Sequence, residues 1–233
     1  AGKRESRRVI GDYILRQSDI DEARVFSDAV CYGGWPMDIH TAGGFVSSGD
    51  VPTVWNHVDD VYTIPYRSFY SVNIPNLFLA GRIISASHVA FSSSRVMATC
   101  AVGGEAVGNA AAIAIQKHLN EAREVGAYIH ELQQKLLKDD AFIPGFRNED
   151  EEDKARKAHI AATEAIDNGK PENVVNGVAR SWKDDINAWV CNIERQPEIS
   201  LSFDKAEPIR EIRLTFDSNL SREITPSIIR EVL

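Results

Sequence analysis

The stretch Asn76-Leu77-Phe78-Leu79-Ala80-Gly81 decides the predicted fold. It is a short apolar run that ends in glycine, which is typical of a strand buried on both faces in a parallel sheet. A polar loop follows over 82–94. Residues 95–118 are then dense in Ala, Val and Ile, which predicts a helix with Ser92-Ser93-Ser94 at its N-cap. We therefore expect a strand–loop–helix unit of an α/β fold.

Three glycines lie inside the predicted helix, at Gly103, Gly104 and Gly108. Each glycine in a helix interior costs about 1 kcal/mol relative to alanine. Their clustering indicates that another part of the protein packs very close to this helix.

The loop between the strand and the helix is where we expect a ligand. Open α/β sheets bind ligands beyond the carboxyl ends of their strands, and the free N–H groups of a helix N-terminus suit phosphate or an electron-rich ring edge. The polar residues of this region are Arg82, Ser85, Ser87, His88, Ser92, Ser93, Ser94 and Arg95. The same residues also fit a plain helix cap with solvent-facing serines, so both interpretations stay open here.

Several site motifs are missing from the sequence. The helix glycines do not have the GxGxxG spacing, and there is no P-loop and no GxSxG sequence. The three cysteines are far apart, without a CxxC or a Cys/His pair at zinc spacing. The chain is therefore not a complete dinucleotide-binding domain, and metal binding is unsupported.

The size and charge of the chain limit its class. It has 233 residues, 43% of them hydrophobic, and a net charge of −8. The acidic excess argues against nucleic acid or an anionic membrane as a partner. No stretch approaches the roughly 18 apolar residues of a membrane helix. The acidic run over 148–153 is typical of a solvated linker, so we place a domain boundary near 147–153, between domains at 1–147 and 148–233.

Shorter elements complete the expected organisation. In the first domain they are a strand over 9–15 with Gly11 at a close backbone approach, loops with short strands over 28–60, an edge or irregular strand over 62–70 and an amphipathic helix over 125–138. In the second domain, strict alternation predicts strands over 197–203 and 209–216 with a turn between them. The alanine content of residues 154–166 favours a helix there.

The first domain resembles a bacterial family of FAD-dependent oxidoreductases with a glutathione-reductase-like fold. The matching stretches are Gly2–Tyr13, Tyr32–His40, Ile64–Ser68 and, best of all, Asn76–Ala112, which contains Leu79-Ala80-Gly81-Arg82, Ser85-Ala86-Ser87-His88 and Arg95-Val96-Met97-Ala98. The resemblance implies that the chain is the C-terminal part of such an enzyme. It holds half of a flavin site and lacks the N-terminal FAD-binding segment, which is its expected partner.

The resemblance also implies roles for individual residues. Gly81 and Arg82 approach the FAD pyrophosphate or ribityl chain, and the turn from Arg95 to Ala98 faces the flavin. The cofactor-binding set implied is Gly81, Arg82, Ser87, Ser94, Arg95, Val96, Met97 and Ala98. The catalytic set is His88, Arg67 and His40, within a polar rim for an acidic or polyhydroxy small-molecule substrate that also includes Arg4, Arg7 and Tyr66.

In one respect the sequence departs from the pattern of this fold. Many relatives carry an acidic residue after the strand glycine, where Arg82 stands here. An arginine can itself neutralise a phosphate.

The activity that the resemblance implies is hydride transfer from a small polar, carbohydrate-related substrate to FAD. It also implies weak or no FAD binding by this chain alone.

The second half resembles a truncated discoidin-like, galactose-binding-like β-sandwich. The residues that carry this resemblance are Pro171–Gly177, Asn187-Ala188-Trp189 and the two alternating stretches. It makes Ala158–Thr163 a strand, against the helix that alanine content favours. It implies glycan as a further partner, favours a periplasmic or secreted location over a cytoplasmic one, and offers an alternative function: an extracytoplasmic carbohydrate-binding or polysaccharide-processing protein.

Overall fold

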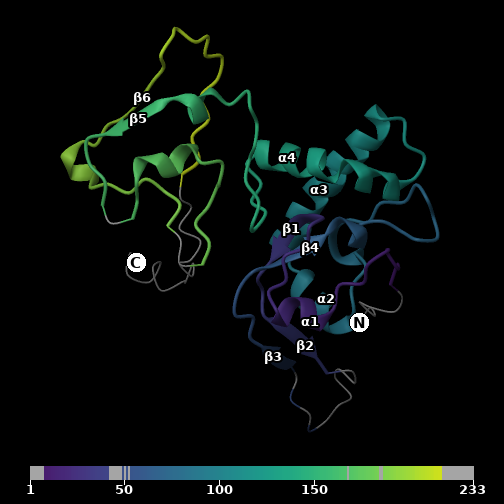
Figure 1. The fold of residues 1–233 in the computed structure, drawn as a ribbon. Coiled ribbons are helices and arrows are strands. Elements are labelled where there is room, and N and C mark those ends of the chain that lie inside the picture. The colour runs from purple at the N-terminus through teal and green to yellow at the C-terminus, as the bar shows by residue number, and fades with distance from the viewer. Residues whose placement is uncertain are drawn as a thin grey trace, which may run out of the picture. The chain divides into compact units, whose positions relative to one another are not determined.

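The computed structural model describes residues 8–41, 49, 51, 53–166, 168–183 and 186–216 (Figure 1). The chain divides into two compact units, Ala1–Glu152 and Asp153–Leu233. The division falls at the end of the acidic run. Within the described residues the fold is a mixture of helices and small antiparallel sheets, which is consistent with a fragment of an α/β protein.

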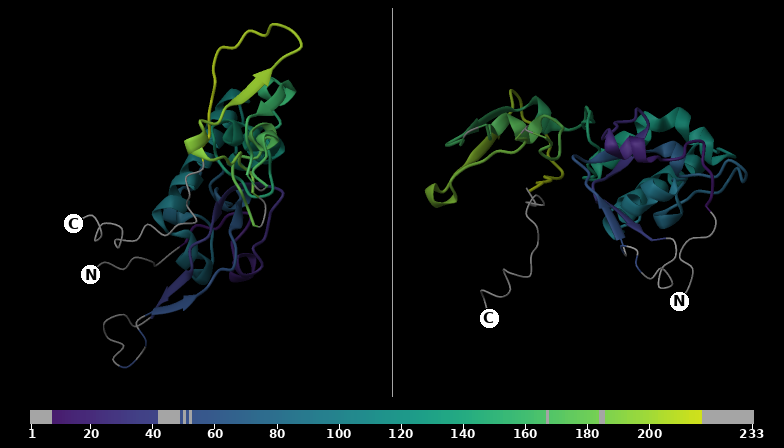
Figure 2. Two further views of the ribbon diagram at one scale, coloured as in Figure 1. Left: turned by 90° about the vertical axis from the view of Figure 1, so that its left-hand side faces the viewer. Right: turned by 90° about the horizontal axis from the view of Figure 1, so that it is seen from below.

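Two short antiparallel ribbons form the β-structure of the first unit. Strand β1 (Ala29–Gly33) pairs with β4 (Tyr62–Pro65), and β2 (Met37–His40) pairs with β3 (Thr53–Asn56). The register of the first pair shifts between Ala29 and Cys31, opposite the end of β4. The irregular strand predicted over 62–70 is therefore confirmed for residues 62–65, whereas residues 66–68 form a 3-10 segment. Figures 1 and 2 show these elements as separate short pairs.

The predicted parallel strand at 76–81 is wrong. In the described chain this stretch makes one isolated antiparallel bridge, between Phe78 and Tyr70, and of its six residues Leu79 alone is buried. The N–H of Leu79 donates to Phe69 O at 2.7 Å, and Ser71 N–H donates to Leu77 O at 3.0 Å. The apolar run thus folds back on the segment just before it, and among the described residues no parallel strand pairs with it.

The strand predicted over 9–15 is also reduced to a single bridge. Leu15 pairs in parallel with Ala86: its N–H donates to Ser85 O at 3.0 Å and its carbonyl accepts from Ser87 N–H at 2.8 Å. The close approach at Gly11 is confirmed, because a Cβ there would lie 2.5 Å from the carbonyl oxygen of Arg67.

The predicted long helix is confirmed as α3 (Met97–Gln116), but its start is different. The stretch before it forms another helix, α2 (His88–Ser94), so Ser92, Ser93 and Ser94 lie inside α2 and do not cap α3. The cap of α2 is Ser87, whose Oγ accepts from Ala90 N–H at 3.3 Å. Short polar side chains can cap a helix or lie within one. Here α2 packs against β2, and the three serines lie within α2.

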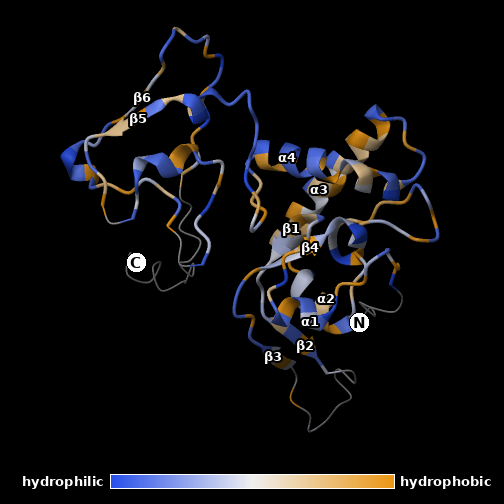
Figure 3. Ribbon diagram, in the orientation of Figure 1, coloured by the Kyte–Doolittle hydropathy of each residue, from blue (hydrophilic) through white to orange (hydrophobic). Residues whose placement is uncertain are grey.

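The core of the first unit lies where β1 and β4 meet α3 and α4 (Ile129–Lys138). Gly103 packs against Phe69, because a Cβ there would lie 2.8 Å from the ring. The close packing predicted for this helix is therefore confirmed at Gly103, whereas Gly104 and Gly108 face open space. In Figure 3 the helices of this unit carry both hydrophobic and hydrophilic segments, as helices with one buried side do.

The remaining helices of this unit are short. The amphipathic prediction over 125–138 is confirmed as a 3-10 segment, η4 (Ala122–Tyr128), followed by α4, with Leu132, Leu136 and Leu137 buried. The other segments are α1 (Gln17–Asp21), η2 (Tyr66–Ser68) and η3 (Gly81–Ile83).

Contrary to the sequence expectation, α3 is long and apolar enough to cross a membrane. The core helices of other proteins pass the same test, and α3 buries residues in the core of this unit.

The second unit contains one ribbon, in which β5 (His159–Ala162) pairs antiparallel with β6 (Ile199–Ser202). The strand alternative for Ala158–Thr163 is therefore confirmed over the helix. Three 3-10 segments accompany the ribbon: η5 (Lys154–Lys157), η6 (Pro171–Val175) and η7 (Ile193–Arg195). The strand predicted over 209–216 is not formed, and Ile212, Leu214 and Phe216 are exposed. The described residues do not show an all-β domain.

Candidate functional site

A pocket of about 130 Å³ lies between β2 and α2. Its walls come from three segments that are distant in the sequence: β2, η3 and α2. The lining residues are Asp38, Ile39, His40, Arg82, His88, Phe91, Ser92 and Arg95. The fold thus brings together five residues singled out from the sequence: His40, Arg82, His88, Ser92 and Arg95.

Asp38 organises one wall of this pocket. Its Oδ2 atom accepts from Arg95 Nη2 at 3.1 Å and lies 3.2 Å from His40 Nε2. Arg95 Nη2 also donates to the Asp38 carbonyl oxygen at 3.2 Å. The Thr53 hydroxyl on β3 donates to the other carboxylate oxygen of Asp38. A carboxylate with three such partners holds the arginine and the histidine in fixed positions.

Sequence reasoning missed Asp38 as a site residue. The available signal was its spacing from His40, because residues two apart in a strand project from the same face. The surrounding loop-rich composition gave no clean period, so the strand that places both side chains on one face was not assigned.

Three guanidinium groups gather around the ring of Phe91. The guanidinium carbons lie 4.5 Å from the ring centroid for Arg8, 5.5 Å for Arg82 and 5.9 Å for Arg95. Arg8 Nη1 also donates to Ala86 O at 2.6 Å and to Ser87 O at 2.8 Å. Burial lowers the pKa of Arg8 from its ordinary value. An aromatic face can hold several guanidinium groups close together, and the region is strongly basic as a result.

Helix α3 begins directly after the pocket residue Arg95. Its N-cap residue, Val96, provides no side-chain hydrogen bond, and Met97 is 89% exposed. Cys100 N–H donates to Val96 O at 2.9 Å, whereas the N–H groups of Met97, Ala98 and Thr99 have no hydrogen-bond partner among the described residues. Gly81 has φ +72 and nothing within 4 Å of a Cβ built there. An uncapped helix start beside an open glycine is an arrangement that accepts an electron-rich or anionic group.

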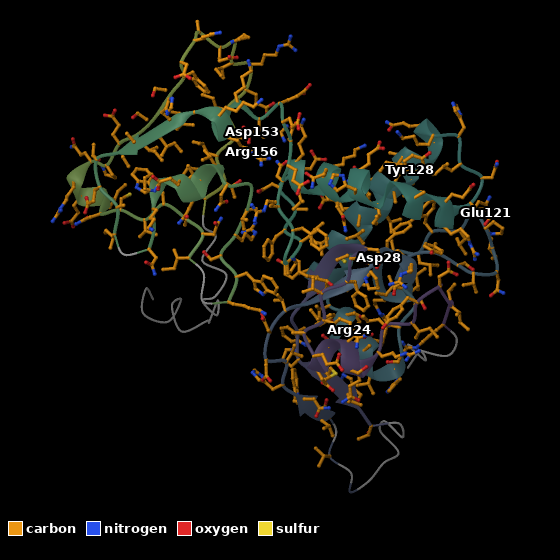
Figure 4. All side chains as sticks on the ribbon, viewed as in Figure 1. Arg24, Asp28, Glu121, Tyr128, Asp153 and Arg156 are labelled. Atoms are coloured by element: carbon orange, nitrogen blue, oxygen red, sulfur yellow. The ribbon has the colours of Figure 1, made fainter. Side chains whose placement is uncertain are left out.

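Other predicted site residues lie outside the pocket. Arg67 Nε donates to Asp28 Oδ2 at 2.8 Å, and its guanidinium lies 5.2 Å from the Tyr13 ring centroid. Asp28, labelled in Figure 4, also accepts the backbone N–H of Arg67 at 3.3 Å. These contacts fix Arg67 in a separate ion pair.

Tyr66 and Ser94 are buried parts of the fold. The Tyr66 hydroxyl donates to Ala122 O at 2.6 Å, and burial raises the pKa of Tyr66 far above its ordinary value. Ser94 is 2% exposed at the end of α2. Arg4 and Arg7 lie outside the described residues.

Comparison with known protein families matches the FAD-dependent oxidoreductases over residues 1–136. This chain belongs to that family. The matched residues contain both ribbons of the first unit, the pocket and all of α3. No curated protein and no solved structure matches the chain.

FAD is the cofactor of this FAD-dependent oxidoreductase family, and the structure offers a place that fits part of it. The uncapped start of α3 and the open position at Gly81 can receive the electron-rich edge of the flavin and its linker. The residues that would hold it are Gly81, Arg82 and the turn from Arg95 to Ala98. Among the described residues no three His, Cys, Asp or Glu side chains gather as metal ligands do.

Proposed function

We infer that this chain supplies the flavin-facing half of an oxidoreductase that transfers a hydride from a small polar, carbohydrate-related substrate to FAD. The observation that carries this proposal is the junction at Arg95, where the basic pocket ends and the uncapped helix α3 begins. A substrate in the pocket would therefore lie beside the place where a flavin edge meets the helix start.

The pocket residues have distinct tasks in this proposal. When bound, FAD supplies the hydride acceptor. His40 and His88 line the pocket and are positioned to take the proton of a substrate hydroxyl group. Arg82 and Arg95 orient the substrate and stabilise negative charge that develops on its oxygen. Asp38 acts through Arg95 and His40, so it is a positioning residue.

The open face of α3 supports the proposed partner, a FAD-binding segment that carries the nucleotide fingerprint. Gly104 and Gly108 have nothing within 4 Å of a Cβ built on them, and Ile115 is 76% exposed on the same helix. Small residues on a helix allow a second backbone to approach closely. We expect this face to contact the FAD-binding segment, which would explain two glycines that no contact with the described residues requires.

Reconstitution tests this proposal. The 233-residue chain is titrated with FAD alone, and again after co-expression with an N-terminal, GxGxxG-bearing segment from a member of the same family. We expect weak or no binding by the chain alone and stoichiometric yellow complex with the segment, measured by flavin absorbance. In the co-expressed protein, Gly108→Leu is expected to lower flavin content several-fold, because the side chain would fill the open face.

Two outcomes contradict the proposal. Stoichiometric flavin on the chain alone would show that the partner segment is unnecessary. A folded complex with the segment that stays colourless at saturating FAD would show that the start of α3 does not hold the flavin. Arg123→Gln is the control, because Arg123 is a half-exposed arginine paired with Asp12, outside the pocket-lining residues.

A further inference from the structure

The basic pocket and two exposed tryptophans lie side by side on the first unit. We propose that together they bind a sugar acid: the pocket takes the carboxylate, and the ring of the sugar lies on Trp35 and Trp55. This inference names the substrate class for the proposed flavin enzyme and in that sense rests on the proposed function. Its binding step, however, needs only residues of this chain.

The charges that line the pocket select an anion. Two arginines and two histidines line it, and Asp38 is the single carboxylate among the described lining residues. Arg95 is 17% exposed in its side chain and is held by Asp38 through Nη2. Its Nε and Nη1 atoms make no hydrogen bond to the described residues. Because Nη2 is engaged by Asp38, the Nε–H and Nη1–H donors lie on different edges of the guanidinium, and each can give a carboxylate oxygen one charge-assisted hydrogen bond. Arg82 lines the same pocket and adds a second positive charge.

The size of the pocket limits what it can enclose. Its volume of about 130 Å³ is well below the roughly 300–1,000 Å³ of pockets that bury a whole drug-sized ligand. One charged group with its adjoining carbon fits, and the rest of the ligand must lie outside the pocket on a neighbouring surface.

That neighbouring surface is aromatic. Trp55 is directly opposite Asp38 in the β2–β3 register, and residues opposite each other in an antiparallel pair project from the same face. The Trp35 and Trp55 ring centroids are 6.2 Å apart, with 46% and 54% of these residues exposed. The Trp35 carbonyl accepts from the Ser93 hydroxyl on α2 at 2.5 Å, which holds this edge against the helix that lines the pocket.

A pair of exposed tryptophans beside an anion pocket favours a sugar acid over an isolated phosphate group. Exposed apolar surface of this kind is typical of binding sites, and indole rings pack against the C–H faces of sugar rings while polar groups stay hydrated. Phosphate would use the arginines but would leave both rings without a contact.

Binding of D-glucuronate to the 233-residue chain tests this inference, with D-glucose as the uncharged ligand of the same ring. Nuclear magnetic resonance titration follows the indole N–H signals of Trp35 and Trp55 and the Nε–H signal of Arg95. We expect D-glucuronate to bind at least about tenfold more tightly than D-glucose, as the loss of a charge-assisted hydrogen bond implies.

Substitutions separate the two halves of the site. Arg95→Gln is expected to weaken D-glucuronate binding about tenfold or more, and Arg95→Lys to restore part of it, since lysine keeps the positive charge but not the planar guanidinium. Trp55→Ala, at an exposed position, is expected to weaken D-glucuronate binding but leave acetate binding unchanged. Arg123→Gln is the control and should bind like the unmodified chain.

Three results would overturn the inference. The first is equal binding of D-glucose and D-glucuronate. The second is full D-glucuronate affinity in a folded Trp55→Ala variant. The third is tighter, Arg95-dependent binding of inorganic pyrophosphate, which would assign the pocket to the phosphates of FAD. None of these titrations contains FAD, so their failure is distinguishable from failure of the flavin reconstitution.

Discussion

The β1–β4 and β2–β3 ribbons have the same antiparallel geometry but differ in how far they are buried. Both are short antiparallel pairs in the same unit. All four residues of β4 are buried beneath the helices, whereas β3 leaves Val54 and Trp55 more than half exposed. The difference teaches that local strand geometry does not assign a role. The covered ribbon belongs to the core, and the open one carries Asp38, His40 and Trp55, which form part of the ligand site that we propose.

The largest expected effect compares one aliphatic residue from each ribbon. Ile64 on β4 is 0% exposed, and Val54 on β3 is 51% exposed. We expect Ile64→Ala to lower the free energy of unfolding by about 2–5 kcal/mol, because it leaves a cavity in a packed core. Val54→Ala should change it by less than about 0.5 kcal/mol. Urea denaturation of both variants checks this, and equal losses would break the contrast between the ribbons.

The contrast between covered and open faces continues along α3. A Cβ at Gly103 would lie 2.8 Å from the buried Phe69 ring, whereas Gly104 has open space. We expect Gly103→Ala to destabilise the protein by about 1–3 kcal/mol through overpacking. Gly104→Ala should stabilise it by about 0.5–1 kcal/mol, because alanine is the better helix former. Thermal denaturation measures both, and two shifts of the same sign would refute this description of α3.

The smallest expected effect depends on pH and concerns Glu105, on the open side of α3. Burial raises the pKa of Glu105, and the nearby Asp139 and Asp140 raise it further. A carboxyl group whose folded pKa is raised costs stability once pH rises above its unfolded pKa. Glu105→Gln should therefore stabilise the protein slightly at pH 7, with the gain vanishing below the ordinary carboxyl range of about pH 4. A gain that persists at pH 3 would point to a cause other than charge.

The candidate site could be predicted in part. His40, Arg82, His88 and Arg95 were named from motif resemblance and from the polar loop, and the structure places them around one pocket. Asp38 was not found, because its role depends on a strand that pairs with residues beyond a long loop. Arg67 was assigned to the site from the motif resemblance, whereas its side chain forms an ion pair with Asp28 outside the pocket and lies over the Tyr13 ring.

The family, the long helix α3 and the irregular strand before Tyr66 could be predicted from the sequence, because they depend on local composition and on a continuous motif. Only the tertiary structure decided that 76–81 folds back instead of joining a parallel sheet, that Ser92, Ser93 and Ser94 belong to α2, and that one helix glycine of three is closely packed. A strand forms only where another strand pairs with it, and a helix face is buried only where other side chains pack against it. In both cases the contacting residues are far away in the sequence.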